Sequence, residues 1–174
     1  GKKEEALLAF QKAAEADPLN PGIHADLGET LLSLDRTEEG IASLDRARDL
    51  EPREPRYWFA AAKGLYDAER YEEAIARVDE LLIPHPWHGR AALIKLDAAR
   101  KLGRADDDDN LYLTAKRAAR YHVISGPRAF LELARFDFAR GDYESALTGF
   151  ERTALALHDV ANARFGIGQA LAKL

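Results

Sequence analysis

The chain has 174 residues, of which 47% are hydrophobic and 32% are charged, and its formal net charge is −5. A length of this order fits one domain or a short array of repeats, and an acidic balance argues against a general nucleic-acid binder, which is usually basic. The chain contains no cysteine, which excludes disulfides and thiolate metal sites and leaves the redox compartment undetermined. No apolar run approaches the roughly 18 residues that a membrane span requires.

Residues 1–20 begin the chain with a helical pattern. Ala6, Phe10 and Ala13 fall on one face at helical spacing, and the Asp-Pro-Leu-Asn segment that follows predicts the end of the helix. We interpret this stretch as the second helix of a truncated repeat, and the chain as a piece of a longer protein.

Residues 21–54 predict the first complete pair of helices. Leucines at helical spacing give the first helix an inward face, and Gly28 is the small residue that a close helix approach needs. Asp35 and Arg36 form the turn between the two helices. His24 lies on the first helix, and we interpret it as a partly buried histidine with a satisfied hydrogen bond rather than as a ligand.

Residues 55–88 repeat this pattern, with a polar joint at Glu69 and Arg70. Prolines and small residues recur at one fixed interval: Pro18, Pro52 and Pro86, and also Ala6, Gly40 and Ala74. A fixed period of about 34 residues predicts stacked helix pairs, because no single pair buries its apolar face alone.

The residues within each period resemble a known family. Counted from Pro55 as the first position, Trp58 is fourth, Ala62 eighth and Ala74 twentieth, and Pro86 falls near the end. A bulky fourth residue, small eighth and twentieth residues and a late proline resemble the tetratricopeptide repeat. The resemblance implies an all-α fold, a right-handed superhelical α-solenoid of antiparallel helix pairs, with about nine to ten helices in a single array over residues 1–174.

Residues 89–126 predict a further helix pair that departs from the family pattern. Lys95 stands where a large apolar residue is usual, Asp108 replaces the small twentieth residue, and Arg120 replaces the late proline. We therefore expect the second helix of this pair to continue to about Tyr121.

Residues 127–160 restore the pattern after a slip in the spacing. The interval from Gly103 to Gly141 is longer than the regular period, so about four extra residues precede Pro127, and we expect a hinge or a change of pitch there. His158 stands at the late proline position. Residues 161–174 then predict one final helix, which either caps the array or ends where the piece was cut.

Two segments invite a metal interpretation, which we reject. His85 and His88 are three residues apart, but the prolines around them break the helix that would hold both on one face. In the acidic run 106–109, Leu111 stands where a calcium loop requires glycine. We expect these carboxylates at the start of a helix, where the free amides and the dipole favour negative charge.

The sequence contains no recognisable catalytic motif. A G-x-S-x-G elbow, a phosphate-binding loop that ends in Gly-Lys-Ser/Thr and an H-E-x-x-H pair are all absent. We therefore predict a protein that is not an enzyme and that has no metal or cofactor.

The family resemblance places the binding surface on the first helices, which line a concave groove in such arrays. The second, fifth, ninth and twelfth positions of three repeats select twelve groove residues: Arg56, Phe59, Lys63, Tyr66, Arg90, Leu93, Asp97, Arg100, Arg128, Leu131, Arg135 and Phe138. Six of them are basic and three are aromatic. Guanidinium groups pair with carboxylates, and aromatic rings supply rigid apolar anchors.

We therefore predict an interaction scaffold or adaptor whose groove binds a peptide segment of a protein partner, acidic or phosphorylated. In the alternative interpretation, the groove arginines are solvated charges, some of them paired with Asp97 or Glu132. Two other functions stay open: a substrate-recruiting arm of a larger glycosyl-, sulfo- or methyltransferase, and a homo-oligomer that assembles through the solenoid ends. Ala25, Glu29 and Phe59 replace the lysine–asparagine clamp with which some family members bind chaperone tails.

Overall fold

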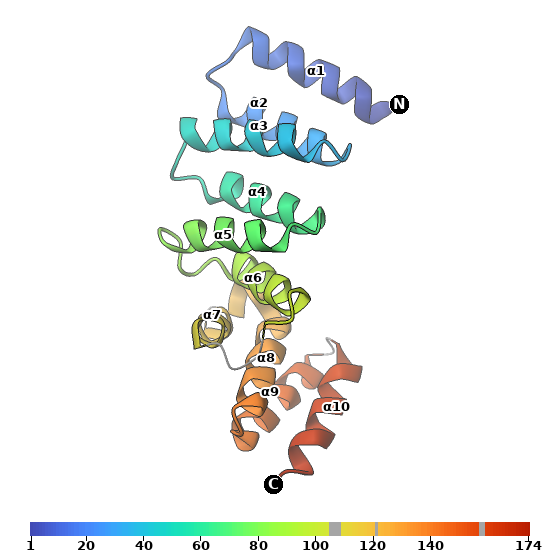
Figure 1. Ribbon diagram of the computed structural model, residues 1–174, viewed down its shortest axis with the longest axis vertical. Coiled ribbons are helices and arrows are strands. Elements are labelled where there is room, and N and C mark those ends of the chain that lie inside the picture. The colour runs from blue at the N-terminus through green and yellow to red at the C-terminus, as the bar shows by residue number, and fades with distance from the viewer. Residues whose placement is uncertain (105–108, 121, 157–158) are drawn as a thin grey trace. The chain divides into compact units, whose positions relative to one another are not determined.

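The structure is a computed structural model that describes residues 1–104, 109–120, 122–156 and 159–174. These residues form ten helices and no strand: α1 (Lys2–Ala16), α2 (Pro21–Leu32), α3 (Thr37–Leu50), α4 (Pro55–Asp67), α5 (Tyr71–Leu82), α6 (Gly89–Lys101), α7 (Asp109–Arg120), α8 (His122–Ala139), α9 (Tyr143–Leu155) and α10 (Val160–Leu171) (Figure 1). The expected all-α fold and number of helices are confirmed. None of the described helices is long and apolar enough to cross a membrane.

The chain divides into two compact units. Residues 1–85 hold α1 to α5, and residues 86–174 hold α6 to α10. Within each unit, helices that follow one another in the chain pack together, and α2 also packs on α4 in the first unit, as α6 packs on α8 in the second. This layering of first helix on first helix is the arrangement that the repeat period predicts.

The turns inside the helix pairs share one backbone geometry. Four turn residues have positive φ angles: Asp35 at 58°, Glu69 at 60°, Gly103 at 69° and Gly141 at 81°. The residue after each of them donates its backbone N–H to a carbonyl five residues earlier, as when Arg36 bonds Leu31 at 3.0 Å. This closure satisfies carbonyl groups that the helix end leaves free, so the turns lie where the sequence predicts them.

The joints between repeats are also periodic. The His24 ring lies 2.9 Å from the Pro18 carbonyl oxygen through Nε2, and at the equivalent position of the next repeat Trp58 Nε1 donates to the Pro52 carbonyl oxygen at 3.1 Å. A carbonyl oxygen only accepts, so Nε2 of His24 carries the proton in this bond. The interpretation of His24 as a satisfied structural residue is confirmed.

Glycine permits the close contact between α2 and α3. A Cβ atom on Gly28 would lie 2.7 Å from Leu44 Cγ and 2.8 Å from the Gly40 carbonyl oxygen. Gly28 and Leu44 are buried at the centre of this contact. The prediction that Gly28 serves close helix packing is confirmed.

The second unit differs from the expected repeat at α8. This helix begins at His122, five residues before the expected start at Pro127, and runs for 18 residues with the proline inside it. The first helices α2, α4 and α6 have 12 or 13 residues. The extra residues of the slipped spacing therefore lengthen the first helix of this repeat at its start instead of forming a loop.

Some predictions about the second unit concern residues that the structure does not describe. Asp109 begins α7 and lies in its first turn, as expected of the acidic run, whereas residues 105–108, and with them Asp108, are not described. The helix α7 ends at Arg120. Tyr121, where this helix was expected to end, and His158 also lie outside the described residues.

Candidate functional site

Four of the predicted groove residues lie along α4 in the first unit: Arg56, Phe59, Lys63 and Tyr66. The two basic side chains are exposed and the two aromatic ones are half-buried, so this face of α4 is accessible to solvent. Lys63 forms an ion pair with Asp67, one helical turn later. Its charge is therefore partly neutralised within the same helix.

Acidic residues of α2 surround the other cation of this face. The guanidinium carbon of Arg56 lies 5.1 Å from the centre of the Tyr57 ring. The pKa of Arg56 is raised, mainly by a hydrogen bond with Tyr57 and also by the negative charges of Glu29 and Asp26. The first-unit face thus carries both signs of charge, and the basic character predicted from the sequence is weaker here.

The half-buried aromatic residues at the ends of α4 and α8 have structural neighbours. Tyr66 meets Tyr71 edge to face with ring centres 5.6 Å apart, and Phe138 meets Tyr143 in the same way at 5.3 Å. In both cases, the ring at the end of a first helix packs against the first residue of the second helix. These rings secure the turn, and only their free edges are accessible to a partner.

The remaining predicted residues lie on α6 and α8 in the second unit: Arg90, Leu93, Asp97 and Arg100 on α6, and Arg128, Leu131, Arg135 and Phe138 on α8. One of them is not a surface residue. Leu131 is only 2% exposed and belongs to the core formed with Ala134, Ala146 and Phe150. Family position alone placed it in the groove, and the structure corrects this by placing its side chain in the interior.

The charged residues of this face form one connected network, called here the arginine network. It consists of Arg135, Glu132, Arg100, Asp97 and Arg128. Glu132 accepts hydrogen bonds from Arg135 at 3.2 Å and from Arg100. Asp97 accepts from Arg100 at 3.1 Å and from Arg128. The network therefore joins α6 to α8 through two carboxylates, each shared by two arginines.

Burial of one carboxylate orients the cations. Glu132 is 2% exposed, whereas the side chains of Arg100, Arg135 and Arg128 are 39%, 30% and 45% exposed. A buried carboxylate is costly unless charged donors surround it, so Glu132 holds two guanidinium groups in place. Three arginines against two carboxylates leave one positive charge on this partly exposed face.

Ion pairs between equivalent helices recur at spacings of 31 or 32 residues. Arg128 and Asp97 are 31 residues apart, and Arg100 and Glu132 are 32 apart. In the first unit, Arg70 (just before α5) and Arg77 (in α5) pair with Glu38 and Asp45 of α3 at a spacing of 32 residues. Arg140, which follows α8, pairs with Asp109 of α7 at a spacing of 31 residues, although α8 is a first helix and α7 a second helix. Opposite charges at 31 or 32 residues, just below the repeat length, are the sequence signal for these contacts.

A buried polar cluster between α7 and α8 was missed at the sequence level. Asp137 is only 7% exposed, and burial raises the pKa of its carboxyl group, an effect opposed by a hydrogen bond from Tyr112. The guanidinium carbon of Arg140 lies 4.6 Å from the centre of the Tyr112 ring. Tyr112 comes from the helix pair that departs from the repeat pattern, so the period does not predict its proximity to Asp137.

His88 has a structural role at the start of α6. His88 caps α6, where its Nδ1 atom accepts a hydrogen bond from the Ala91 N–H at 3.2 Å. Within the described ranges, no group of three or more His, Asp or Glu residues is arranged to hold a metal ion.

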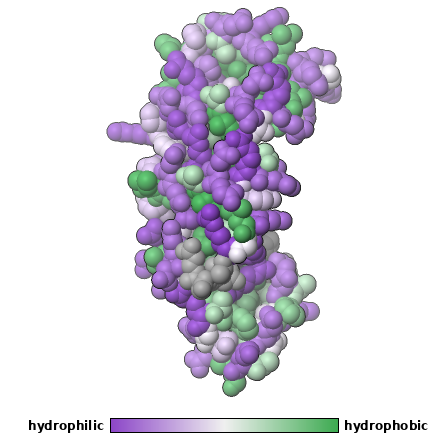
Figure 2. Space-filling view, viewed as in Figure 1, coloured by the Kyte–Doolittle hydropathy of each residue, from purple (hydrophilic) through white to green (hydrophobic). Residues whose placement is uncertain are grey.

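Figure 2 shows that the visible surface is mostly hydrophilic, with hydrophobic side chains in small separate groups.

Part of the chain matches a family model. Residues 1–64 match the model of a tetratricopeptide repeat family, and no curated protein matches the sequence. The match covers the first 64 residues, and the helix-pair architecture of the described residues agrees with a tetratricopeptide-repeat fold.

Several solved structures share the fold. YrrB, described as a tetratricopeptide-repeat protein with an unusual peptide-binding site, has a TM-score of 0.75 at 20% identity over 94% of this chain and 82% of its own. MamA has a TM-score of 0.73 at 16% identity, over 90% of this chain and 89% of its own. PilF of Pseudomonas aeruginosa has a TM-score of 0.70 at 19% identity, over 98% of this chain and 82% of its own. Identities this low establish a common fold.

Proposed function

We propose that this protein is a non-enzymatic interaction module that binds a segment of a partner protein on the exposed faces of its first helices. The observation that carries this proposal is the arginine network on α6 and α8. Its two carboxylates hold three guanidinium groups on one partly exposed face. Guanidinium groups pair with the carboxylate or phosphate oxygen atoms of an acidic partner.

The segment that suits this face is acidic, and a phosphorylated residue satisfies the same donors. Arg90 is exposed at the start of α6, and Leu93 is half-buried on the same helix. The partner therefore meets cations beside a small apolar surface, the combination that anchors peptides in interfaces. The peptide-binding site in the description of YrrB supports a peptide as the ligand.

The arginine network also limits the affinity for an acidic segment. Each incoming carboxylate competes with Asp97 or Glu132 for donors that are already in use. Exposed ion pairs are individually weak and are screened by salt. We therefore expect micromolar binding that weakens strongly as ionic strength rises.

A matched pair of variants tests the proposal. The first variant combines Arg90→Gln with Arg128→Gln, which removes two exposed cations and leaves both bonds to Glu132 intact. The control combines Arg104→Gln with Arg117→Gln, two exposed arginines outside the network. Both variants change the net charge by the same amount, so a general charge effect acts on both equally.

The assay is fluorescence anisotropy with a labelled peptide that has two leucines between runs of glutamate. We expect the first variant to bind at least about tenfold more weakly than the unaltered chain and the control to stay within about twofold. Equal binding by the two variants, with helicity intact by circular dichroism, would refute the assignment of this face.

A further inference from the structure

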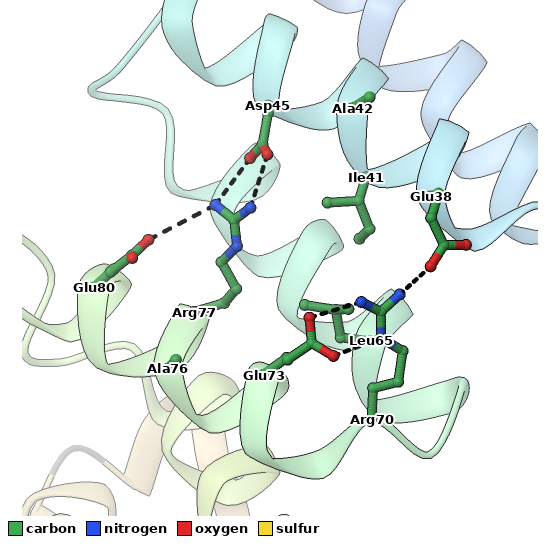
Figure 3. Close-up of a pocket in the computed structure, with 10 residues that line it drawn as sticks. All are labelled: Glu38, Ile41, Ala42, Asp45, Leu65, Arg70, Glu73, Ala76, Arg77 and Glu80. Carbon is green, nitrogen blue, oxygen red and sulfur yellow. Dashed lines mark hydrogen bonds and ion pairs between the residues drawn. The ribbon is translucent and has the colours of Figure 1, made fainter.

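A hollow lies between the second helices α3 and α5 of the first unit. Figure 3 shows its residues, with Ile41 and Ala42 on α3, Ala76 on α5 and Leu65 of α4 beneath them. No Cα atom of α3 comes within 8 Å of one of α5, although both helices are described throughout. The helices thus diverge above α4 and leave a hollow of about 460 Å³.

Small side chains keep this hollow open. Ala42 and Ala76 are both exposed and occupy the same position in successive repeats. A larger residue at either position would fill the space above Leu65. The floor is therefore apolar: Leu65 is buried at its base, and Ala42 and Ala76 are accessible beside it.

Ion pairs close the two ends of the hollow. At one end, Arg70 donates to Glu38 at 2.5 Å and to Glu73 at 2.6 and 2.7 Å. At the other end, Arg77 donates to Asp45 at 2.8 and 3.0 Å. Figure 3 shows both guanidinium groups lying between α3 and α5, each directed at a carboxylate of the opposite helix.

Glu80 completes the rim at the Arg77 end, at 3.7 Å from that guanidinium. The rim as a whole is acidic. Among the lining residues, four carboxylates (Glu38, Asp45, Glu73 and Glu80) stand against two guanidinium groups (Arg70 and Arg77). Asp45 also pairs with Arg48 at 2.8 Å, so the excess negative charge lies on the three glutamates.

The excess negative charge is accessible. Both arginines are engaged by carboxylates, whereas the side chains of Glu38, Glu73 and Glu80 are 79%, 56% and 54% exposed. Exposed carboxylates around an apolar floor favour a ligand with cations around an apolar centre.

We propose that this hollow binds a basic segment of a partner protein, in which one aliphatic side chain is flanked on both sides by lysine or arginine. The aliphatic side chain occupies the space between Ala42 and Ala76, and the flanking cations pair with Glu38 at one end and Glu80 at the other. This surface lies on second helices and has the opposite charge to the arginine network, so it goes beyond the function proposed above and stands without it.

The test uses the full chain labelled with ¹⁵N and a synthetic peptide with one leucine between two pairs of arginines. We expect the amide signals of Ala42, Ala76 and their helical neighbours to shift on titration with this peptide. A peptide in which glutamates replace the arginines should leave these signals in place. No shift with the basic peptide, or equal shifts with both peptides, would overturn the proposal.

Two variants separate the hollow from general surface binding. Ala42→Leu with Ala76→Leu fills the hollow at exposed positions, and we expect the basic peptide to bind about tenfold more weakly. The control, Ala16→Leu with Ala139→Leu, adds the same side chains at exposed helix ends elsewhere and should bind like the unaltered chain. Equal binding by the filled variant and the control would place the peptide elsewhere and refute the assignment.

Discussion

The substitution Gly28→Ala has two effects of opposite sign on the free energy of unfolding. Alanine favours a helix interior over glycine by about 1 kcal/mol. In α2, however, the added Cβ atom would lie 2.8 Å from the Gly40 carbonyl oxygen and 2.7 Å from Leu44 Cγ. The carbonyl oxygen belongs to the backbone of α3, so the strain is relieved only if the two helices move apart.

Overpacking of a buried contact costs about 1 to 3 kcal/mol, and loosening of the contact also exposes apolar surface. We therefore expect steric strain to outweigh helix propensity, with a net loss of about 1 to 2 kcal/mol in the free energy of unfolding. For a chain of this length, each kcal/mol lowers the melting temperature by about 2 to 4 °C.

The matched control is Gly168→Ala in α10. A Cβ atom on Gly168 meets nothing within 4 Å, so only helix propensity acts, and we expect a gain of about 0.5 to 1 kcal/mol. Urea unfolding followed by circular dichroism measures both changes. The reasoning would be refuted if Gly28→Ala were as stable as the unaltered chain, or if both substitutions changed stability in the same direction.

Three further predictions concern charged groups. Glu132→Gln should lower the free energy of unfolding by about 1 to 3 kcal/mol, because Arg100 and Arg135 lose the carboxylate between them; an unchanged urea midpoint would contradict this. Burial raises the pKa of Asp137 above its ordinary value of 3.8, so its ionisation opposes folding and stability falls as pH rises through the folded pKa. Asp137→Asn should therefore stabilise the chain at neutral pH and lose that advantage in acid, which urea midpoints across pH will show. The pKa of Asp142 is shifted in the opposite direction, since a hydrogen bond from Ser145 lowers it. The carboxylate of Asp142 therefore stabilises the fold at neutral pH, and this stabilisation is lost in acid. Asp142→Ala should destabilise the chain only at higher pH.

The sequence predicts the fold well because the same pattern recurs in each repeat, so that a turn found in one repeat is predicted at the equivalent place in the next. The turn at Asp35 and the turn at Glu69 have φ angles of 58° and 60° although neither residue is glycine. The period marks both positions, and Gly103 then occupies the equivalent one. Periodic structure is therefore predicted even where the local residue types are unusual.

The surface is harder to predict, because family position does not determine the environment of a side chain. Leu131 occupies a groove position by count, yet its side chain is in the core. Because α8 begins before Pro127, its residues have a different environment from the equivalent residues of α4. Counting positions from Pro127 does not show that difference. The pairing of Asp97 with Arg128 follows the 31-residue spacing, which a search for complementary charges near the repeat length would have found.

The hollow between α3 and α5 has no sequence motif. Ala42 and Ala76 match the ordinary composition of a helix, and their effect depends on the divergence of α3 from α5 above Leu65. Only the arrangement of three helices shows that two small residues leave an accessible space between two ion pairs.

The central claim is that the arginine network binds an acidic segment of a partner. The most direct test is a parallel pull-down from a lysate of the source organism with three baits: the unaltered chain, the Arg90→Gln, Arg128→Gln variant, and the Arg104→Gln, Arg117→Gln control. We predict a protein that the unaltered and control baits retain, that the Arg90→Gln, Arg128→Gln bait loses, and that the glutamate-rich peptide displaces. Retention of every captured protein by all three baits would contradict the claim.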